Sequence, residues 1–308
     1  MSKGIIKGLQ ASEFQHPEDK KALDFLESIK ILDVTLETIL KYTSEAMMKF
    51  VKAGSCIEIN EEQYPSVYRI FVECCKILDI EKIPVLYLDR GGVISTNVDG
   101  ITEPIVLITG GAISTLSEEE LYFLFGQALG QIKAGHLKYH KVAELLTSGG
   151  LSEVIGVSIA SIKKELLSWY RVSVLSSDRA GMLCCQSRNT AMSVLAKMTG
   201  YIRNSNENLD IEVFIEQPKK FKQKQDENSF WKDTHYLFNS VKTPLTVLRA
   251  ANLLEWIDQG GYEKIMECSF NPDGLIPKVP SETKVCSNCG FDKVPASSFI
   301  CPECGMPA

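Results

Sequence analysis

Four cysteines near the end of the chain have the type and spacing that most clearly predict chemistry. They form two C-x2-C pairs, separated by eleven residues, in "CSNCGFDKVPASSFICPECG" (Cys286, Cys289, Cys301 and Cys304). A glycine follows each pair and permits the tight turn in which backbone N–H groups approach the thiolate sulfurs. Four thiolates around zinc leave no open coordination position. The pattern therefore predicts a structural zinc site and is favoured over a redox pair or a chance spacing.

The charge around these cysteines indicates what the module would bind. Between Ile276 and Ala308 the sequence has three lysines and three acidic residues, so the segment has no net charge. A neutral module gives no reason to expect nucleic-acid binding. A ribbon that binds protein or associates with itself is the better expectation.

A second stretch, "FLFGQALGQIKAGH" (123–136), is apolar with a helical period. Ser117 followed by Glu120 forms a capping-box pattern before it, so we expect a helix from there to about Leu146. Two interpretations are open for this helix. It is a plain core helix, or it is a metal-binding helix whose ligands have been replaced.

His136 and His140 are spaced i, i+4 and are a possible ligand pair of their own. On an unbroken helix, nine residues past Gln127 correspond to a rotation of roughly 180°. The pair would then face away from the Gln127 side. We therefore expect no metal site at these histidines.

The elements that must position these residues follow from periodicity and from glycine and proline signals. Helices are predicted over 17–54, 61–79, 118–146, 151–170, 176–199 and 244–258. Strands are predicted over 84–89 and 104–109, joined by a strand-loop-strand connection, and 217–228 is predicted to be an exposed loop or helix face. The expected organisation is one domain over 1–270, a linker over 271–284 and a four-cysteine ribbon over 285–308.

Composition limits the class of protein. The chain has 308 residues, 44% of them hydrophobic, which suffices for one sizeable core plus a smaller module. Its net charge of -6 argues against nucleic acid or an anionic membrane as the main partner. No apolar run reaches the roughly 20 residues of a transmembrane helix, and the N-terminus lacks a signal-peptide pattern. Adjacent cysteines such as Cys74 and Cys75 rarely pair with each other, so we expect a reducing, cytoplasmic compartment.

The stretch at 123–136, taken with its surroundings, resembles the HtpX-like zinc metallopeptidases, a gluzincin-like family that includes the CAAX prenyl proteases. Soluble members have a pattern close to F-x-x-G-H-E-L-G-H-I-K-x-G-H. The matching positions are Phe123, Gly126, Leu129, Gly130, Ile132, Lys133, Gly135 and His136. Further familial segments are "FQHPEDKKAL", "QYP", "WYRVSVLSSDRAGMLCCQS" and "TPLTVLRAANLLEW", so the resemblance covers about Phe14 to Met266. It implies a mostly helical α+β fold of the zincin-like type, followed by the zinc ribbon.

The resemblance also implies where a catalytic site would lie. In the family, two histidines and a glutamate from a later helix bind zinc, and a glutamate after the first histidine is the general base. A later histidine before proline is thought to stabilise the oxyanion. The HExxH frame here reads Gln127-Ala128-Leu129-Gly130-Gln131. Val174 stands at the third ligand and Thr243 at the later histidine, whereas Asp178, Arg179, Gly181 and Arg249 fit the family frame.

These replacements lead to two main functional hypotheses; a third possibility is that the first domain is only a scaffold and the ribbon makes the partner contact. The first is a catalytically inactive homologue, a pseudopeptidase that binds, regulates or scaffolds a protein or peptide partner. In it only the ribbon holds zinc, and no catalytic zinc is expected. The second is a working zinc metalloendopeptidase with unorthodox ligands. Because no reactive group of the family remains at the site, the first is preferred.

Overall fold

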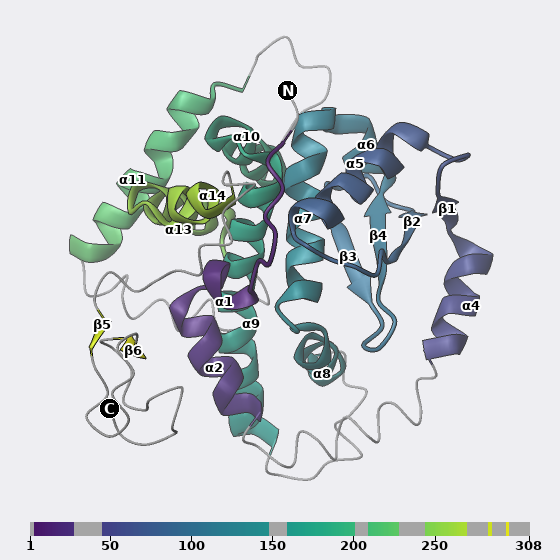
Figure 1. The fold of residues 1–308 in the computed structure, drawn as a ribbon, viewed down its shortest axis with the longest axis horizontal. Helices are drawn as coiled ribbons and strands as arrows, with labels where there is room; N and C mark the ends of the chain where they lie inside the picture. Colours follow the sequence, from purple (N-terminus) through teal and green to yellow (C-terminus); the bar gives the residue numbers. More distant parts are fainter. Residues whose placement is uncertain are drawn as a thin grey trace. The chain divides into compact units, whose positions relative to one another are not determined.

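The computed structural model describes residues 3–27, 45–147, 159–200, 209–227, 244–269, 283–284 and 294–295 (Figure 1). The chain divides into two compact units, Met1–Met266 and Glu267–Ala308. The first unit is mostly helical with one small mixed sheet, so the predicted α+β class is confirmed. In the second unit, β5 (Thr283–Lys284) pairs antiparallel with β6 (Val294–Pro295).

The sheet of the first unit has the strand order β1-β2-β4-β3. β2 (Val85–Asp89) and β4 (Ile105–Thr109) pair in parallel and correspond to the strands predicted over 84–89 and 104–109. β3 (Thr96–Asp99) pairs antiparallel with β4 and lies at one edge. β1 (Ile57–Ile59) pairs antiparallel with β2 and was not predicted, because three residues are too short for a periodic signal.

Alternation along the strands separates two apolar faces. Leu86, Val106 and Ile108 belong to the main core, whereas Ile105 and Leu107 form a separate small cluster with Tyr87. The main core also contains Phe71 and Phe125, whose rings pack edge to face with centroids 5.2 Å apart. Two helices, α5 (Pro65–Ile77) and α7 (Glu118–Lys133), are thereby joined in the main core.

The remaining helices are α1 (Ala11–Phe14), α2 (Pro17–Glu27), α4 (Glu45–Ser55), α6 (Gly110–Thr115), α8 (Leu137–Thr147), α9 (Ile159–Cys185), α10 (Arg188–Thr199), α11 (Ile211–Glu227), α13 (Thr246–Asp258) and α14 (Gly261–Ser269). The charged stretch 217–228 lies largely on α11, in agreement with its reading as a helix face. Within the described ranges, no helix is long and apolar enough to cross a bilayer.

Two predicted helix boundaries are wrong. The helix that starts at the capping box of Ser117 and Glu120 ends at Lys133, well before Leu146. Gly135 has φ +71°, a left-handed conformation that stops a right-handed helix, and α8 starts afresh at Leu137. Conversely, α9 runs unbroken to Cys185, through the 170–176 region where two helices had been expected.

Helices α7 and α9 lie side by side in the first unit and cross at unusually close range (Figure 1). A Cβ on Gly126 would lie 2.8 Å from the Gly181 Cα and the Cys184 Cβ. A Cβ on Gly130 would lie 2.4 Å from the Ala180 Cβ and 3.7 Å from the Ser177 Cα. The later residue of α7 thus meets the earlier residue of α9, so the two helices run antiparallel. Glycines at the contact allow this approach.

Candidate functional site

The positions of the predicted catalytic site lie on the paired helices α7 and α9. Gln127 and Gln131 are one turn apart on α7, and Val174 and Asp178 are one turn apart on α9. Residues four apart share a helix face. These positions therefore lie on neighbouring helices, with Gln127 at the level of Asp178.

Gln127 is held by a buried polar network. Its Nε2 donates to Asp178 Oδ1 at 2.5 Å. The same carboxylate accepts two hydrogen bonds from Arg249 on α13, from Nε at 3.0 Å and from a terminal nitrogen at 2.7 Å. All three side chains are buried. The Gln127 amide, the Asp178 carboxylate and the Arg249 guanidinium thus form one closed network.

The charges of this network balance internally. Burial disfavours the charged guanidinium of Arg249, but the charge and hydrogen bonds of Asp178 outweigh burial and raise its pKa above the ordinary value. A bidentate guanidinium–carboxylate pair satisfies both groups away from water. The site therefore contains an ion pair with no net charge, next to a neutral amide.

Asp178 accepts a hydrogen bond from Gln127 as a supporting carboxylate accepts one from a metal-binding histidine. In metal sites, a ligating imidazole usually donates its second N–H to such a carboxylate, which fixes the orientation of the ring. Here the donor to that carboxylate is an amide N–H. The supporting group at this position is present although the imidazole is not.

The residues present do not fit a catalytic zinc ion. Gln127 and Gln131 offer only neutral amides, and Val174 offers no lone pair. Ala128 lies in the main hydrophobic core and carries no group that accepts a proton. Within the part of the chain that the structure describes, no three His, Cys, Asp or Glu side chains come together to hold a metal ion. Thr243 lies outside the described residues.

His136 and His140 do not lie on the helix that carries Gln127. The rotation argument is wrong because α7 ends at Lys133, so His136 does not continue its helix. His136 is fully buried, with Nε2 3.0 Å from Asp19 Oδ2, and His140 Nε2 lies 2.7 Å from Ser173 Oγ. The two rings thus contact different polar partners.

Asp19 is the centre of a second buried cluster that sequence reasoning missed. It accepts hydrogen bonds from Trp169 Nε1 at 2.9 Å and from the Ser176 hydroxyl, and it faces His136. These contacts fasten α2 to α9 and to the turn before α8. In the sequence, Asp19 gave only the signal of an acidic first helical turn.

The cysteines of the first unit are free thiols. They are Cys56, Cys74, Cys75, Cys184 and Cys185. Burial raises the pKa of Cys75 and of Cys185 to about 12, so both stay protonated and unreactive near neutral pH. Cys286, Cys289, Cys301 and Cys304 lie outside the described residues, and their zinc site stays a prediction.

Comparison with known proteins gives one informative relative. No family model matches the sequence, and no solved structure matches it. The chain is 27% identical over 279 residues to the plastoglobule-localized metallopeptidase 48, chloroplastic, of Arabidopsis thaliana. The match covers 89% of this chain and 80% of that protein. Over most of its length, this chain is therefore similar to a metallopeptidase.

Proposed function

We propose that the protein is a catalytically inactive homologue of the HtpX-like zinc metallopeptidases that acts by binding a protein or peptide. The observation that carries this proposal is the bonding of Gln127. At the position of the first zinc ligand, a buried amide donates to Asp178, and Arg249 neutralises that carboxylate. A peptidase of this type needs an imidazole lone pair there. The bonding at Gln127 supports a protein that keeps the scaffold of such a peptidase but lacks the groups that activate water.

The edge of the sheet supports peptide binding. β3 is an edge strand among the described strands, and it packs against α7. An edge strand can pair with an extended peptide through backbone hydrogen bonds, which need no metal. Gln131 is half-buried on α7, the helix against which β3 packs, and its amide offers both a donor and an acceptor. We infer that an extended peptide binds along this edge of the sheet.

The C-terminal cysteines complete the proposal. Cys286, Cys289, Cys301 and Cys304 hold one structural zinc, in a ribbon that offers a second protein-binding surface. The zincin-like identity of the first unit and the ribbon identity of the second are parts of this proposal. So is the cytoplasmic location, which the name of the chloroplast relative makes worth checking by imaging a tagged chain.

The second candidate is an active zinc metalloendopeptidase with unorthodox ligands. The observation that favours it is the name of the Arabidopsis relative, a metallopeptidase. The residues at Gln127, Ala128, Gln131 and Val174 oppose it, because none of them provides an anionic or imidazole ligand or a general base.

Restoring the catalytic groups tests the first candidate. Gln127→His, Ala128→Glu, Gln131→His and Val174→Glu would be combined in one chain. We expect this variant to bind one more zinc ion than the unmodified chain, since Asp178 already lies where it would orient an imidazole at 127. Ala128→Glu alone is the control and should add no zinc, because it supplies a base but no ligand set.

Activity separates the two candidates. The unmodified protein should not cleave an unfolded protein substrate above background, with or without a chelator. Cleavage that a chelator abolishes, and that Gln127→Ala also abolishes, would show that the second candidate is right.

A further inference from the structure

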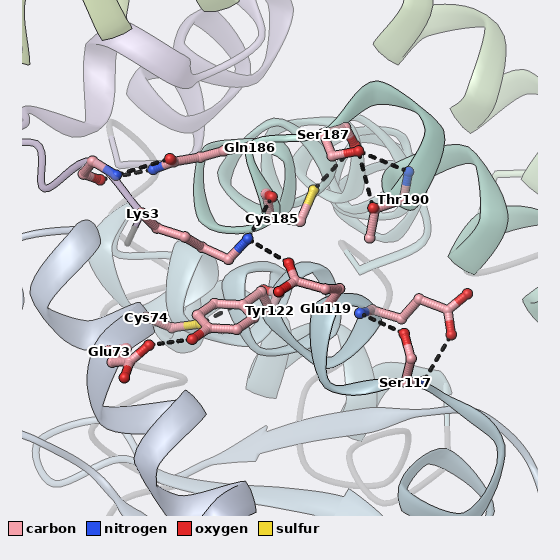
Figure 2. A network of polar contacts seen from close by, with 12 residues as sticks. Lys3, Glu73, Cys74, Ser117, Glu119, Tyr122, Cys185, Gln186, Ser187 and Thr190 are labelled. Carbon is pink, nitrogen blue, oxygen red and sulfur yellow. Dashed lines mark hydrogen bonds and ion pairs between the residues drawn. The ribbon is translucent and has the colours of Figure 1, made fainter. Parts of the chain in front are cut away.

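The N-terminal segment Lys3–Leu9 is held along the protein like a bound peptide. It belongs to no helix or strand, and its side chains differ sharply in exposure. Ile6 and Leu9 lie in the main core, whereas Ile5 is 47% exposed. Figure 2 shows its first residues between the start of α7 and the end of α9. The residues that hold it, which we call the groove, are Ile77, Asp79, Glu119, Tyr122, Cys185 and Gln186. They include no residue of the Gln127 network.

The Lys3 ammonium group contacts three groups that favour a cation (Figure 2). Its Nζ lies 2.7 Å from Glu119 Oε2 and 2.9 Å from the carbonyl oxygen of Cys185, and 4.5 Å from the centre of the Tyr122 ring. Cys185 is the last residue of α9, where the helix dipole is negative. A carboxylate, a helix carbonyl and an aromatic face are all favourable to a cation. The Lys3 side chain is only 13% exposed.

The Gln186 side chain forms two hydrogen bonds with the backbone of Gly4, the residue after Lys3. The Gly4 N–H donates to Gln186 Oε1 at 2.8 Å, and Gln186 Nε2 donates to the Gly4 carbonyl oxygen at 2.7 Å. One side-chain amide thus satisfies both backbone groups of Gly4, as a paired strand would. Further along, the Ile6 N–H donates to the Ile77 carbonyl oxygen at 3.2 Å.

Two residues of the groove adopt an unfavourable backbone conformation. Among the described residues, three that are not glycine have positive φ: Tyr64, Asp79 and Gln186. Asp79 and Gln186, both at φ 53°, are the two whose side chains hold the segment, since Asp79 Oδ2 accepts from the Gly8 N–H at 3.1 Å. Glycine would adopt this conformation more readily. Glycine would fit the backbone better at both positions, yet each position has a residue whose side chain bonds the segment.

We propose that this groove is a peptide-binding site for a segment with lysine, then glycine, then a buried aliphatic residue two positions on. Its resident ligand is Lys3–Leu9 of the same chain, and its ligand in trans is the same segment of a second copy. Each contact is made to a group of this short segment, so a second copy offers the same contacts. In a single chain the tether gives the attached segment the advantage of a high effective concentration. Exchange therefore requires that the attached segment be weakened.

A binding experiment with full-length chains tests the site. Lys3→Glu with Gly4→Pro weakens the attached segment, because it reverses the charge and removes the N–H that Gln186 accepts. A fluorescent peptide of residues 1–10 should bind this variant and bind the unmodified chain at least about tenfold more weakly. Lys3→Gln is the milder form, to be used if the double variant loses its helical circular dichroism.

Gln186→Gly is the matched change on the groove side. Glycine suits φ 53° and removes only the amide, so a merely structural Gln186 would leave peptide binding intact. Added to the segment variant, Gln186→Gly should abolish binding of the peptide. Mixing the segment variant with a full-length Glu119→Lys, Gln186→Gly chain should yield a one-to-one heterodimer in light scattering, since one chain has a free groove and the other a free segment.

Two results would overturn the proposal. One is a folded segment variant that fails to bind the peptide. The other is peptide binding of equal strength with and without the Gln186 side chain. Neither result depends on whether the protein is a peptidase, so the outcome is separate from that of the proposed function.

Discussion

At the scale of single residues, the Gln127 position owes its character to Asp178. Asp178 is 1% exposed. It accepts hydrogen bonds from the neutral Gln127 amide and from two nitrogens of the Arg249 guanidinium, Nε and a terminal nitrogen. A buried carboxylate without its cation would be costly, so Arg249 determines whether this network can exist. The polar centre left beside α7 is therefore stable without a metal ion.

Asp178→Asn is predicted to destabilise the protein severely. The change leaves the buried Arg249 charge without its counter-charge, which costs about 3–5 kcal/mol of unfolding free energy. Urea unfolding followed by circular dichroism measures it. Asp258→Asn is the matched control, because Asp258 is 59% exposed and lies 3.8 Å from Arg188. That change should stay within about 0.5 kcal/mol, and equal effects of the two substitutions would contradict the importance of the network.

The residues of the candidate site were partly predictable. The resemblance singled out Gln127, Asp178 and Arg249 by position, but no local pattern indicates that the amide of one bonds the carboxylate of another. The Asp19 cluster was not predictable, because its contact to His136 joins residues far apart in the sequence. Side-chain partners of this kind depend on tertiary packing, which periodicity does not reveal.

At the scale of elements, local signals predicted starts better than ends. The capping box of α7 was read correctly from Ser117 and Glu120. The end at Lys133 was missed, because the apolar pattern continues into α8 and only Gly135 marks the turn. The unbroken α9 was missed because its 170–176 stretch lacks a clear apolar period, although burial against α2 and α7 keeps it helical.

Gly126→Ala tests the close packing of α7 on α9. Alanine favours a helix by up to about 1 kcal/mol over glycine. At this position its methyl group would lie 2.8 Å from the Ala180 carbonyl oxygen, the Gly181 Cα and the Cys184 Cβ. We expect a net loss of about 1–3 kcal/mol in unfolding free energy. Gly54→Ala in α4 has no neighbour within 4 Å and should be neutral or slightly stabilising.

The capping glutamate of α7 predicts a pH dependence. Burial raises the pKa of Glu120, but hydrogen bonds from Lys197, Ser193 and the Ser117 N–H outweigh burial and lower it below the ordinary value of 4.5. A carboxylate with a lowered pKa in the folded state stabilises the fold above pH 4.5 and loses this contribution as the pH falls towards its folded pKa.

Glu120→Gln checks this sign. The difference in unfolding free energy between the unmodified chain and the variant should be constant near neutral pH and should shrink as the pH falls below 4.5. Chemical denaturation at several pH values measures it. A difference that grows towards acid pH would contradict the role assigned to the Lys197 and Ser193 contacts.

At the scale of the whole molecule, the two compact units contain different candidate sites. The first unit holds the Gln127 network and the groove of Lys3–Leu9, and the second contains the four cysteines with metal spacing. The main strands were predictable from the sequence pattern, and the mixed class from the family resemblance.

Zinc content per chain tests the central claim most directly. The purified protein should contain about one zinc ion per chain, and Cys286→Ser combined with Cys301→Ser should reduce it to none. A zinc ion that remains in this cysteine variant, and that Gln127→Ala together with Gln131→Ala removes, would contradict the account, because it would place a metal at the site where the structure has an amide, a carboxylate and a guanidinium.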